Sequence, residues 1–580
     1  MPIIYNEQEK TFHLECKDSS YIMGIAHDIY LTHLYYGKKT KMLHPSRKMV
    51  SRELGFSPSP LAFFHNRSVS LDTMPQEFPS FGYTDFRIPA IIIEQENGSR
   101  ITDFHYKSFE ILDQKPAIKG LPSLRSEENE TQTLIIHLWD DVTKVEVCLY
   151  YNVYHQRNVI TRHVKVINHG TQTLKITKIV SCSFDMHDKE FNFLQLHGTH
   201  CKERHIEVTP LRHGITKIES RRGSSSHMLN PFFALLRKDV TEDYGEVYGL
   251  NFVYSGNYEG AVEVDQRDTA RVQMGLGSFD FMWTLQPNET FEAPEVVMVY
   301  SDKGLNGMSQ TFHNLYNERL IKRHYHHPIV VNNWEATYFG FNQENLQALL
   351  KSAKGLGIET FVLDDGWFGK RNNDECSLGD WKVNLDKLPG GLQKVADLAK
   401  ENGLKFGLWF EPEMISIDSD LYRSHPDYAI RICDREHAVS RCQLVLDLSR
   451  KDVCEYVIDS ISKIVDEIPI SYIKWDFNRN LTETQSKDLC HKYVLGLYSI
   501  LEALTNKYPD MLIEGCSGMY FRTCLPRASR SKQTVKRYDT VFPFFLFSLM
   551  FAISKHSLRS CFAALRQVVR FFVRFLLCDF

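Results

Sequence analysis

Hydrophobic and polar residues alternate in two different ways along the chain, and the change falls near residue 326. Up to about residue 325, short runs rich in Val, Ile, Thr and Tyr are separated by Asn, Gly and Asp, as in residues 133–140, 144–154, 158–170 and 262–276. Such runs are typical of β-strands, and long helical periodicity is scarce. We therefore expect residues 1–325 to form a large antiparallel β-sandwich.

From about Pro328, short apolar runs alternate with amphipathic segments, which predicts repeated βα units and a parallel sheet. The expected strands are residues 330–335, 360–368, 404–413, 443–449, 470–476 and 511–518. The helices between them carry apolar stripes, and the first two end at Gly355 and Gly403. Residues 326–518 thus predict a (β/α)8-type barrel of which only about six strands are present.

Polar and aromatic residues end nearly every expected strand of this barrel. They are Trp334 and Glu335; Asp364, Asp365 and Trp367; Trp409, Glu411 and Glu413; Asp447; Lys474 and Asp476; and Glu514 and Cys516. The site of such a barrel is built at the C-terminal ends of its strands. Indole faces beside carboxylates suit a sugar, so the pattern favours a carbohydrate site over a purely structural barrel.

The segment SYIKWDFNRN (residues 471–480) concentrates this chemistry. In a strand, Lys474 and Asp476 share one face and Trp475 takes the other. An ammonium keeps a neighbouring carboxylate ionised, as a nucleophile or a stabiliser of a developing cation requires. The alternative is a plain strand-end ion pair. Asp364 and Asp365 are adjacent, and we expect the turn at Gly366 to direct both toward one ligand.

Composition narrows the possibilities. At 580 residues the chain predicts two or three domains, and a net charge of −4 gives no reason to expect nucleic acid or an anionic membrane. Thirteen scattered cysteines without a CxxC pair, and a start without a secretory signal, predict a cytoplasmic protein. We expect no metal at His324, His326 and His327, which have no acidic or Cys partner nearby. The loop at residues 71–87 is either a structural wrap or part of a binding surface.

Several longer motifs make the family recognisable. They are LDTMPQEFPSFG (71–82), SRRGSSSHMLNPF (220–232), NNWEATYF (332–339), VLDDGWFGKRNND (362–374), LGDWKVNLDKLPGGL (378–392), GLWFEPEM (407–414), QLVLDLSR (443–450), YIKWDFNRN (472–480) and EGCSG (514–518). With them, residues 1–518 closely resemble the bacterial, melibiase-type α-galactosidases of glycoside hydrolase family 36.

The resemblance implies retaining hydrolysis of terminal α-galactosyl groups from oligosaccharides such as melibiose and raffinose, with Asp476 as nucleophile. It implies that the terminal galactose is bound by Asp364, Asp365, Trp409, Arg441, Lys474, Trp475, Asn478, Cys516 and Gly518. It further implies an N-terminal β-supersandwich, a homotetramer, and no metal or organic cofactor.

The resemblance stops after Gly518. The family continues with a glycine-rich run and a strand with a WTSDN-like motif, whose Asp is the general acid/base. Residues 519–580 instead contain no glycine and carry eleven Lys and Arg against two Asp and Glu, whereas the preceding residues carry 57 against 70. This tail resembles a shifted reading frame or a wrong join. Asp539 does not follow an apolar strand, and the apolar run at 541–553 is short for a membrane span.

We therefore expect the chain to be an α-galactosidase by descent that is impaired or inactive as written. Two alternatives remain open at this stage. One is a non-catalytic galactoside-binding protein, and the other is a transglycosylase of the raffinose-synthase kind.

Overall fold

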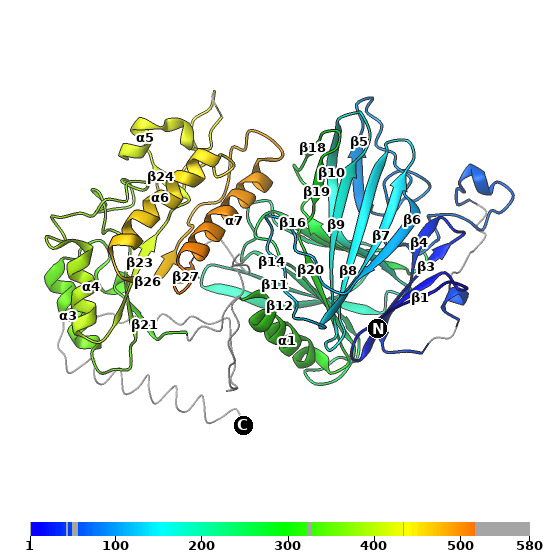
Figure 1. Cartoon of the computed structure of the whole chain (residues 1–580), viewed down its shortest axis with the longest axis horizontal. Coiled ribbons are helices and arrows are strands. Elements are labelled where there is room, and N and C mark those ends of the chain that lie inside the picture. Colours follow the sequence, from blue (N-terminus) through cyan, green and yellow to red (C-terminus); the bar gives the residue numbers. More distant parts are fainter. Residues whose placement is uncertain (1, 42–43, 49–55, 322–326, 433, 517–580) are drawn as a thin grey trace.

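The computed structural model describes residues 2–41, 44–48, 56–321, 327–432 and 434–516. Antiparallel sheets, coloured blue to green, form one half of the molecule, and βα units, coloured green to orange, form the other (Figure 1). The predicted fold class, a β-sandwich followed by a parallel barrel-type sheet, is confirmed. Residues 517–580, which include Gly518, Asp539 and the run at 541–553, lie outside the described residues, as do His324 and His326.

Three antiparallel sheets build the N-terminal half. Their orders are β1-β2-β3-β4, then β13-β16-β17-β10-β18 with β5 on β10, then β12-β11-β14-β15-β20-β9-β8-β7-β6 with β19 on β9. The strands are β1 (Ile3–Asn6), β2 (Thr11–Glu15), β3 (Ser19–Ala26), β4 (Tyr30–Lys38), β5 (Ile91–Glu94), β6 (His105–Leu112), β7 (Thr131–Asp140), β8 (Val145–Tyr154), β9 (Val159–Asn168), β10 (Leu174–Met186), β11 (Phe191–Thr199), β12 (Lys202–Pro210), β13 (Gly214–Glu219), β14 (Leu229–Arg237), β15 (Val247–Phe252), β16 (Tyr258–Val264), β17 (Ala270–Leu276), β18 (Trp283–Leu285), β19 (Thr290–Glu292) and β20 (Val296–Ser301).

The strand patterns named in the sequence are all found in these sheets. Residues 133–140, 144–154 and 158–170 correspond to β7, β8 and β9, and residues 262–276 form a hairpin between β16 and β17. One long helix, α1 (Gly304–Leu315), also lies in this half. Its Met308, Phe312 and Leu315 recur at helical spacing and are buried in a core shared with β15 and β20.

Charged residues of the loop at 71–87 attach it to the sandwich, as expected if the loop is a structural wrap. Glu77 is fully buried, and its carboxylate accepts hydrogen bonds from the hydroxyls of Tyr21 at 2.7 Å and Tyr151 at 2.8 Å. Arg87 donates to Asp185 of β10 at 3.1 Å. Because a buried charge needs partners to offset its lost hydration, these contacts fix the loop to the sandwich.

Replacing Asp185 with Ala is expected to lower the free energy of unfolding by about 3–5 kcal/mol. The carboxylate accepts two hydrogen bonds from Arg271, at 2.8 and 2.9 Å, and the variant would leave buried cations without it. Chemical denaturation measures the loss. The matched control is Asp188→Ala, whose partly exposed pair with Arg237 is worth only ~0–1 kcal/mol. Equal losses of unfolding free energy in the two variants would contradict the prediction that the buried Asp185 pair matters more for stability than the partly exposed Asp188 pair.

Five parallel strands in the order β21-β22-β23-β26-β27 form the described part of the barrel sheet. Its elements are β21 (Val330–Asn332), β22 (Thr360–Leu363), β23 (Lys405–Phe410), β26 (Ile470–Trp475) and β27 (Leu512–Gly515), with helices α2 (Trp334–Thr337), α3 (Gln343–Ala353), α4 (Gly391–Glu401), α5 (Asp420–Ser424), α6 (Lys451–Glu467) and α7 (Leu489–Lys507). Gly403 follows α4 with φ of +79°, a left-handed conformation that ends a helix at low cost for glycine.

The expected strand at residues 443–449 is not part of the barrel sheet, which corrects that prediction. Its first residues form β25 (Gln443–Val445), which pairs antiparallel with β24 (Met414–Ser416). Asp447 then accepts a hydrogen bond from the Ser449 amide in the turn that leads into α6. A buried apolar run looks the same in either sheet, so periodicity could not reveal its pairing. Asp476 therefore follows the fourth described parallel strand.

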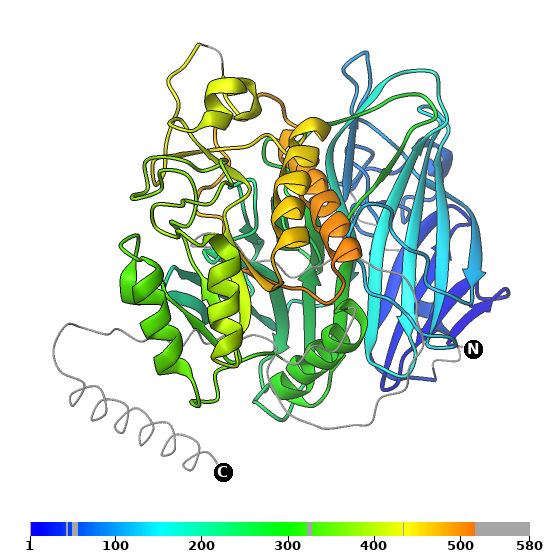
Figure 2. The ribbon, with the colours of Figure 1, turned by 60° about the vertical axis from the view of Figure 1, so that its left-hand side comes forward.

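Helix α7 joins the two halves (Figure 2). Within this contact the Tyr498 hydroxyl accepts from the Ser255 amide at 2.8 Å, and the Tyr254 hydroxyl lies 2.8 Å from Nδ1 of His491. His491 is buried, and burial lowers its pKa to about 4, so the ring is neutral here. A single core cluster includes residues of both halves.

None of the helices in the described ranges is long and apolar enough to cross a bilayer.

Candidate active site

Four neighbouring parallel strands place their C-terminal ends together. Asp364 and Asp365 follow β22, Glu411 follows β23, Asp476 follows β26, and Cys516 follows β27. The register fixes this alignment, because Leu363 of β22 pairs with Leu408 of β23, and Trp409 pairs with Lys474 of β26. The structure thus brings most of the sequence-predicted residues to one rim.

Asp476 lies at the centre of this rim and is 8% exposed. Its Oδ2 accepts from Asn478 Nδ2 at 2.7 Å and from Trp409 Nε1 at 3.2 Å, while Oδ1 accepts from the Phe477 amide at 2.9 Å. Hydrogen bonds to a carboxylate favour its ionised form. These three hydrogen bonds hold the carboxyl group of Asp476 in a fixed orientation.

Lys474 shares the face of Asp476, as the strand alternation predicts. Its Nζ donates to Asp364 Oδ2 at 2.7 Å. Burial opposes the charge of Lys474, but attraction to Asp364, Cys516 and Asp476 outweighs it and raises the pKa of the ammonium. The cation consequently stays charged between two carboxylates.

Asp364 and Asp365 have different partners. Asp364 is paired with Lys474, whereas Arg371 donates to both oxygens of Asp365, at 3.0 Å from Nε to Oδ1 and 3.0 Å from Nη2 to Oδ2. Burial raises the pKa of Asp365, and Arg371 partly offsets that effect. Gly366 adopts φ of +102°, as the expected turn requires.

The other predicted residues lie at different depths. Trp409 is buried, with its ring parallel to that of Phe368, and Trp475 donates from its indole to Glu413 at 2.8 Å on the opposite face. Arg441 is partly exposed, and although burial lowers its pKa, the nearby carboxylates of Asp374 and Asp476 help to raise it above its usual value. Cys516 donates its amide hydrogen to the carbonyl of Trp475 at 2.7 Å, and burial together with Asp476 raises the pKa of its thiol.

Sequence reasoning missed Gln443 and Arg371 as members of the site, and it named Glu411 only as one of the strand-end acids. Glu411 is two positions beyond Trp409 and so shares its face, a signal that strand alternation offered. It accepts from the Asn478 amide at 2.7 Å. Arg371 and Gln443 come from a loop and from β25, and no strand periodicity points to them.

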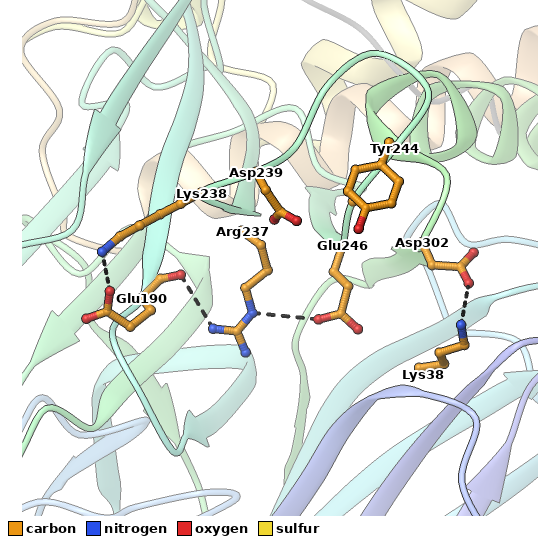
Figure 3. Close-up of a pocket in the computed structure, with 9 residues that line it drawn as sticks. Lys38, Glu190, Arg237, Lys238, Asp239, Tyr244, Glu246 and Asp302 are labelled. Atoms are coloured by element: carbon orange, nitrogen blue, oxygen red, sulfur yellow. Dashed lines mark hydrogen bonds and ion pairs between the residues drawn. The ribbon is translucent and has the colours of Figure 1, made fainter.

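The sandwich carries a separate polar pocket of about 480 Å³ (Figure 3). Each of its three cations is paired with an acid: Arg237 lies 3.6 Å from Glu246, Lys38 lies 3.5 Å from Asp302, and Lys238 contacts Glu190. The pocket therefore offers no free carboxylate pair, and we place the chemistry at the barrel rim.

One group in the described part of the chain has metal-ligating side chains close together. The ligand atoms of His137, Glu146 and Cys148 lie within 4.8 Å of one another on β7 and β8. Glu146 already bonds His137 at 2.9 Å and His169 at 2.8 Å, so hydrogen bonding accounts for the cluster. That the barrel site needs no metal or organic cofactor stays a prediction.

Comparison with known proteins gives the family. The family described as Glycosyl hydrolase family 36 N-terminal domain matches residues 29–286, and the family described as Melibiase matches residues 290–525. The α-galactosidase AgaA of Geobacillus stearothermophilus is 48% identical over 530 residues, which cover 89% of this chain and 72% of that protein. The chain belongs to glycoside hydrolase family 36.

Other family 36 members agree. An α-galactosidase of Lactobacillus acidophilus is 46% identical over 89% of this chain and 72% of its own length. The crystal structure of the Geobacillus stearothermophilus α-galactosidase AgaB superposes with a TM-score of 0.87 at 48% identity, over 90% of this chain and 73% of that one. A variant of AgaA was crystallised in complex with raffinose, and it superposes with a TM-score of 0.86 at 47% identity, over 88% and 72%.

Proposed function

We propose that this family 36 chain binds terminal α-galactosyl groups of oligosaccharides and attacks them with Asp476 in a retaining reaction. The observation that carries the proposal is the carboxyl group of Asp476 at the end of β26, held in one orientation by hydrogen bonds from Asn478 and Trp409. The attack would form a covalent galactosyl ester, and water would release galactose in a second step.

The remaining roles are proposed from the family resemblance together with the contacts at the rim. Lys474 and Asp364 form a pair that can donate to and accept from adjacent sugar hydroxyls. The other proposed galactose-binding residues are Asp365, Trp409, Arg441, Trp475, Asn478, Cys516 and Gly518. The indole of Trp475 donates to Glu413 and so faces away from the rim. We therefore propose that Trp475 contributes to the subsite through its backbone, whose carbonyl accepts a hydrogen bond from the Cys516 amide. The complex of an AgaA variant with raffinose supports raffinose as a substrate, and the family resemblance adds melibiose.

We further propose that hydrolysis by this chain is impaired. Retaining hydrolysis needs two carboxyl groups about 5–5.5 Å apart, one attacking and one protonating the leaving oxygen. The family motif that supplies the second has no counterpart in the sequence of residues 519–580. A galactoside-binding protein without turnover is the second candidate, because the contacts that orient Asp476 are present while that motif is missing.

The organisation of the whole protein is also part of the proposal. We assign residues 1–325 to a β-supersandwich domain, 326–518 to the catalytic barrel and 519–580 to an aberrant tail. By resemblance we propose a cytoplasmic homotetramer.

An aryl α-galactoside with a good leaving group tests the proposed function, since its phenol departs without protonation. We expect release of the phenol from the α-anomer and none from the matching β-galactoside. Calorimetry with galactose then separates the two candidates, because saturable binding without phenol release identifies the binding protein. Absence of both binding and release would refute the proposal.

A further inference from the structure

Two buried carboxyl groups follow strand β23, and their surroundings differ. Glu413 has a donor on each oxygen: the indole of Trp475 on Oε1 and the hydroxyl of Tyr493 on Oε2, both at 2.8 Å. Glu411 has two donors on Oε1, Gln443 Nε2 at 2.8 Å and the Asn478 amide at 2.7 Å. Within the described residues, no donor reaches its Oε2. The environment of Glu413 thus suits a carboxylate, and that of Glu411 does not.

Gln443, the partner of Glu411, also has one side-chain atom without a hydrogen-bond partner among the described residues. Its amide nitrogen donates to Glu411, but its Oε1 is buried and, in the described part of the chain, accepts no hydrogen bond. Both side chains are within 1% of complete burial. A buried polar atom without a partner costs about 1–3 kcal/mol, so two such atoms on one interacting pair call for an explanation.

One proton on Glu411 would satisfy both atoms if its Oε2 faces Oε1 of Gln443. If Oε2 of Glu411 carries a hydrogen, it can donate to Oε1 of Gln443 while Gln443 Nε2 donates to Oε1 of Glu411. A carboxylic acid and a primary amide then form a ring of two hydrogen bonds, in which every donor and acceptor matches. We infer that Glu411 is held as the neutral acid by Gln443 and acts as a positioning residue for Asn478.

The charges around Glu411 agree with this inference. The pKa of Glu411 is raised to about 8, first by burial and next by the neighbouring Asp476, with a smaller contribution from Asp365, whereas the hydrogen bond from Gln443 and the charge of Arg441 lower it. Asp476 and Glu411 follow the adjacent strands β26 and β23, and like charges brought close together disfavour ionisation of one of the two groups. Because no donor from the described residues reaches Oε2 of Glu411, we place the proton on this group.

A neutral Glu411 would affect the proposed reaction of Asp476 through Asn478. This step of the inference rests on the proposed function. Asn478 links the two groups, because its backbone amide donates to Glu411 and its side chain donates to Asp476. Glu411 thus fixes the residue that orients the nucleophile, without adding a second negative charge. The negative charge of this part of the site is then concentrated on Asp476.

Infrared difference spectra of the full chain, wild type minus Glu411→Gln, test the protonation directly. At pH 6 we expect the carbonyl band of a protonated carboxylic acid in the wild type, and its loss above pH 8. The matched control is Glu413→Gln, which removes a carboxylate of equal burial and should leave that band in place. A band that is absent in the wild type, or lost in the control instead, would overturn the inference.

The pH dependence of stability gives a second readout that needs no substrate. The pKa of Glu411 is raised from 4.5 to about 8, so between these values the folded chain keeps a proton that the unfolded chain has lost. This contribution to stability is complete below pH 4.5 and is lost as pH rises through 8. The melting temperature of the wild type should therefore fall over this range relative to that of Glu411→Gln. Parallel melting curves would overturn the inference.

Binding of 1-deoxygalactonojirimycin, a basic galactose analogue crystallised with a variant of AgaA, tests the positioning role. We expect Glu411→Ala to weaken binding at least about tenfold, and Glu411→Gln, which keeps the acceptor for Asn478, to restore it. Loss of binding in Glu411→Gln would show that the negative charge is needed and would overturn the inference. If the wild type itself does not bind, the proposed function fails, while the infrared and stability results still decide the state of Glu411.

Discussion

Replacing Asp476 with Asn is expected to lower the rate of phenol release from an activated aryl α-galactoside by at least about 10³-fold. An amide keeps the shape of the carboxylate and the acceptor for Trp409, but it cannot attack the anomeric carbon. Rapid mixing measures the phenol, and intact-protein mass spectrometry measures the covalent galactosyl adduct. We expect both to vanish in Asp476→Asn.

Asp447→Asn is the matched control for this variant. Asp447 also follows an apolar strand, but β25 lies outside the barrel sheet and Asp447 accepts from Ser449 within its own turn. We expect phenol release by this variant to equal that of the unaltered chain. A covalent adduct that persists in Asp476→Asn would assign the nucleophile to another residue.

The rate at which this chain cleaves α-galactosides is expected to depend strongly on the leaving group. General acid catalysis contributes about 10²–10⁴-fold, so raffinose should be hydrolysed more slowly than by intact relatives by roughly that factor. An activated aryl α-galactoside should instead give a burst of about one equivalent of phenol, because its first step needs no acid, followed by slow release. Pre-steady-state and steady-state rates measured on the same preparation give both quantities.

Azide provides the control for this prediction. It attacks the covalent intermediate without first losing a proton, so it should accelerate steady-state turnover of the aryl substrate if the base is missing. Hydrolysis of raffinose at the rate of intact relatives, with no response to azide, would show that an acid/base residue is present. The impairment would then be refuted while the role of Asp476 stood.

Local periodicity was enough to predict the orientation of the central residues. Alternation along β26 put Lys474 and Asp476 on one face and Trp475 on the other, and the contacts with Asp364 and Glu413 confirm it. The amphipathic helices were equally predictable, because their apolar stripes report burial at a spacing that no strand shares.

Pairing between distant segments could not be predicted in the same way. The run at 443–449 was expected in the barrel, yet β25 pairs with β24, since a buried apolar run carries no information about its neighbour. The separate partners of Asp364 and Asp365 were missed for a related reason: Arg371 comes from a loop whose path is set by tertiary contacts. Glu411 was noticed only as a strand-end acid, because its special environment depends on Gln443.

The contact between α7 and the sandwich limits how the two halves can be exchanged among relatives. Because Tyr498 and His491 bond to residues of the sandwich, a chimaera that joins this barrel to a foreign sandwich would break buried hydrogen bonds along the seam. Helix α7 is the next helix after Asp476, the proposed nucleophile, so we expect such a chimaera to lose activity as well as stability. For protein engineering, the practical unit of transplantation is the sandwich together with this helix.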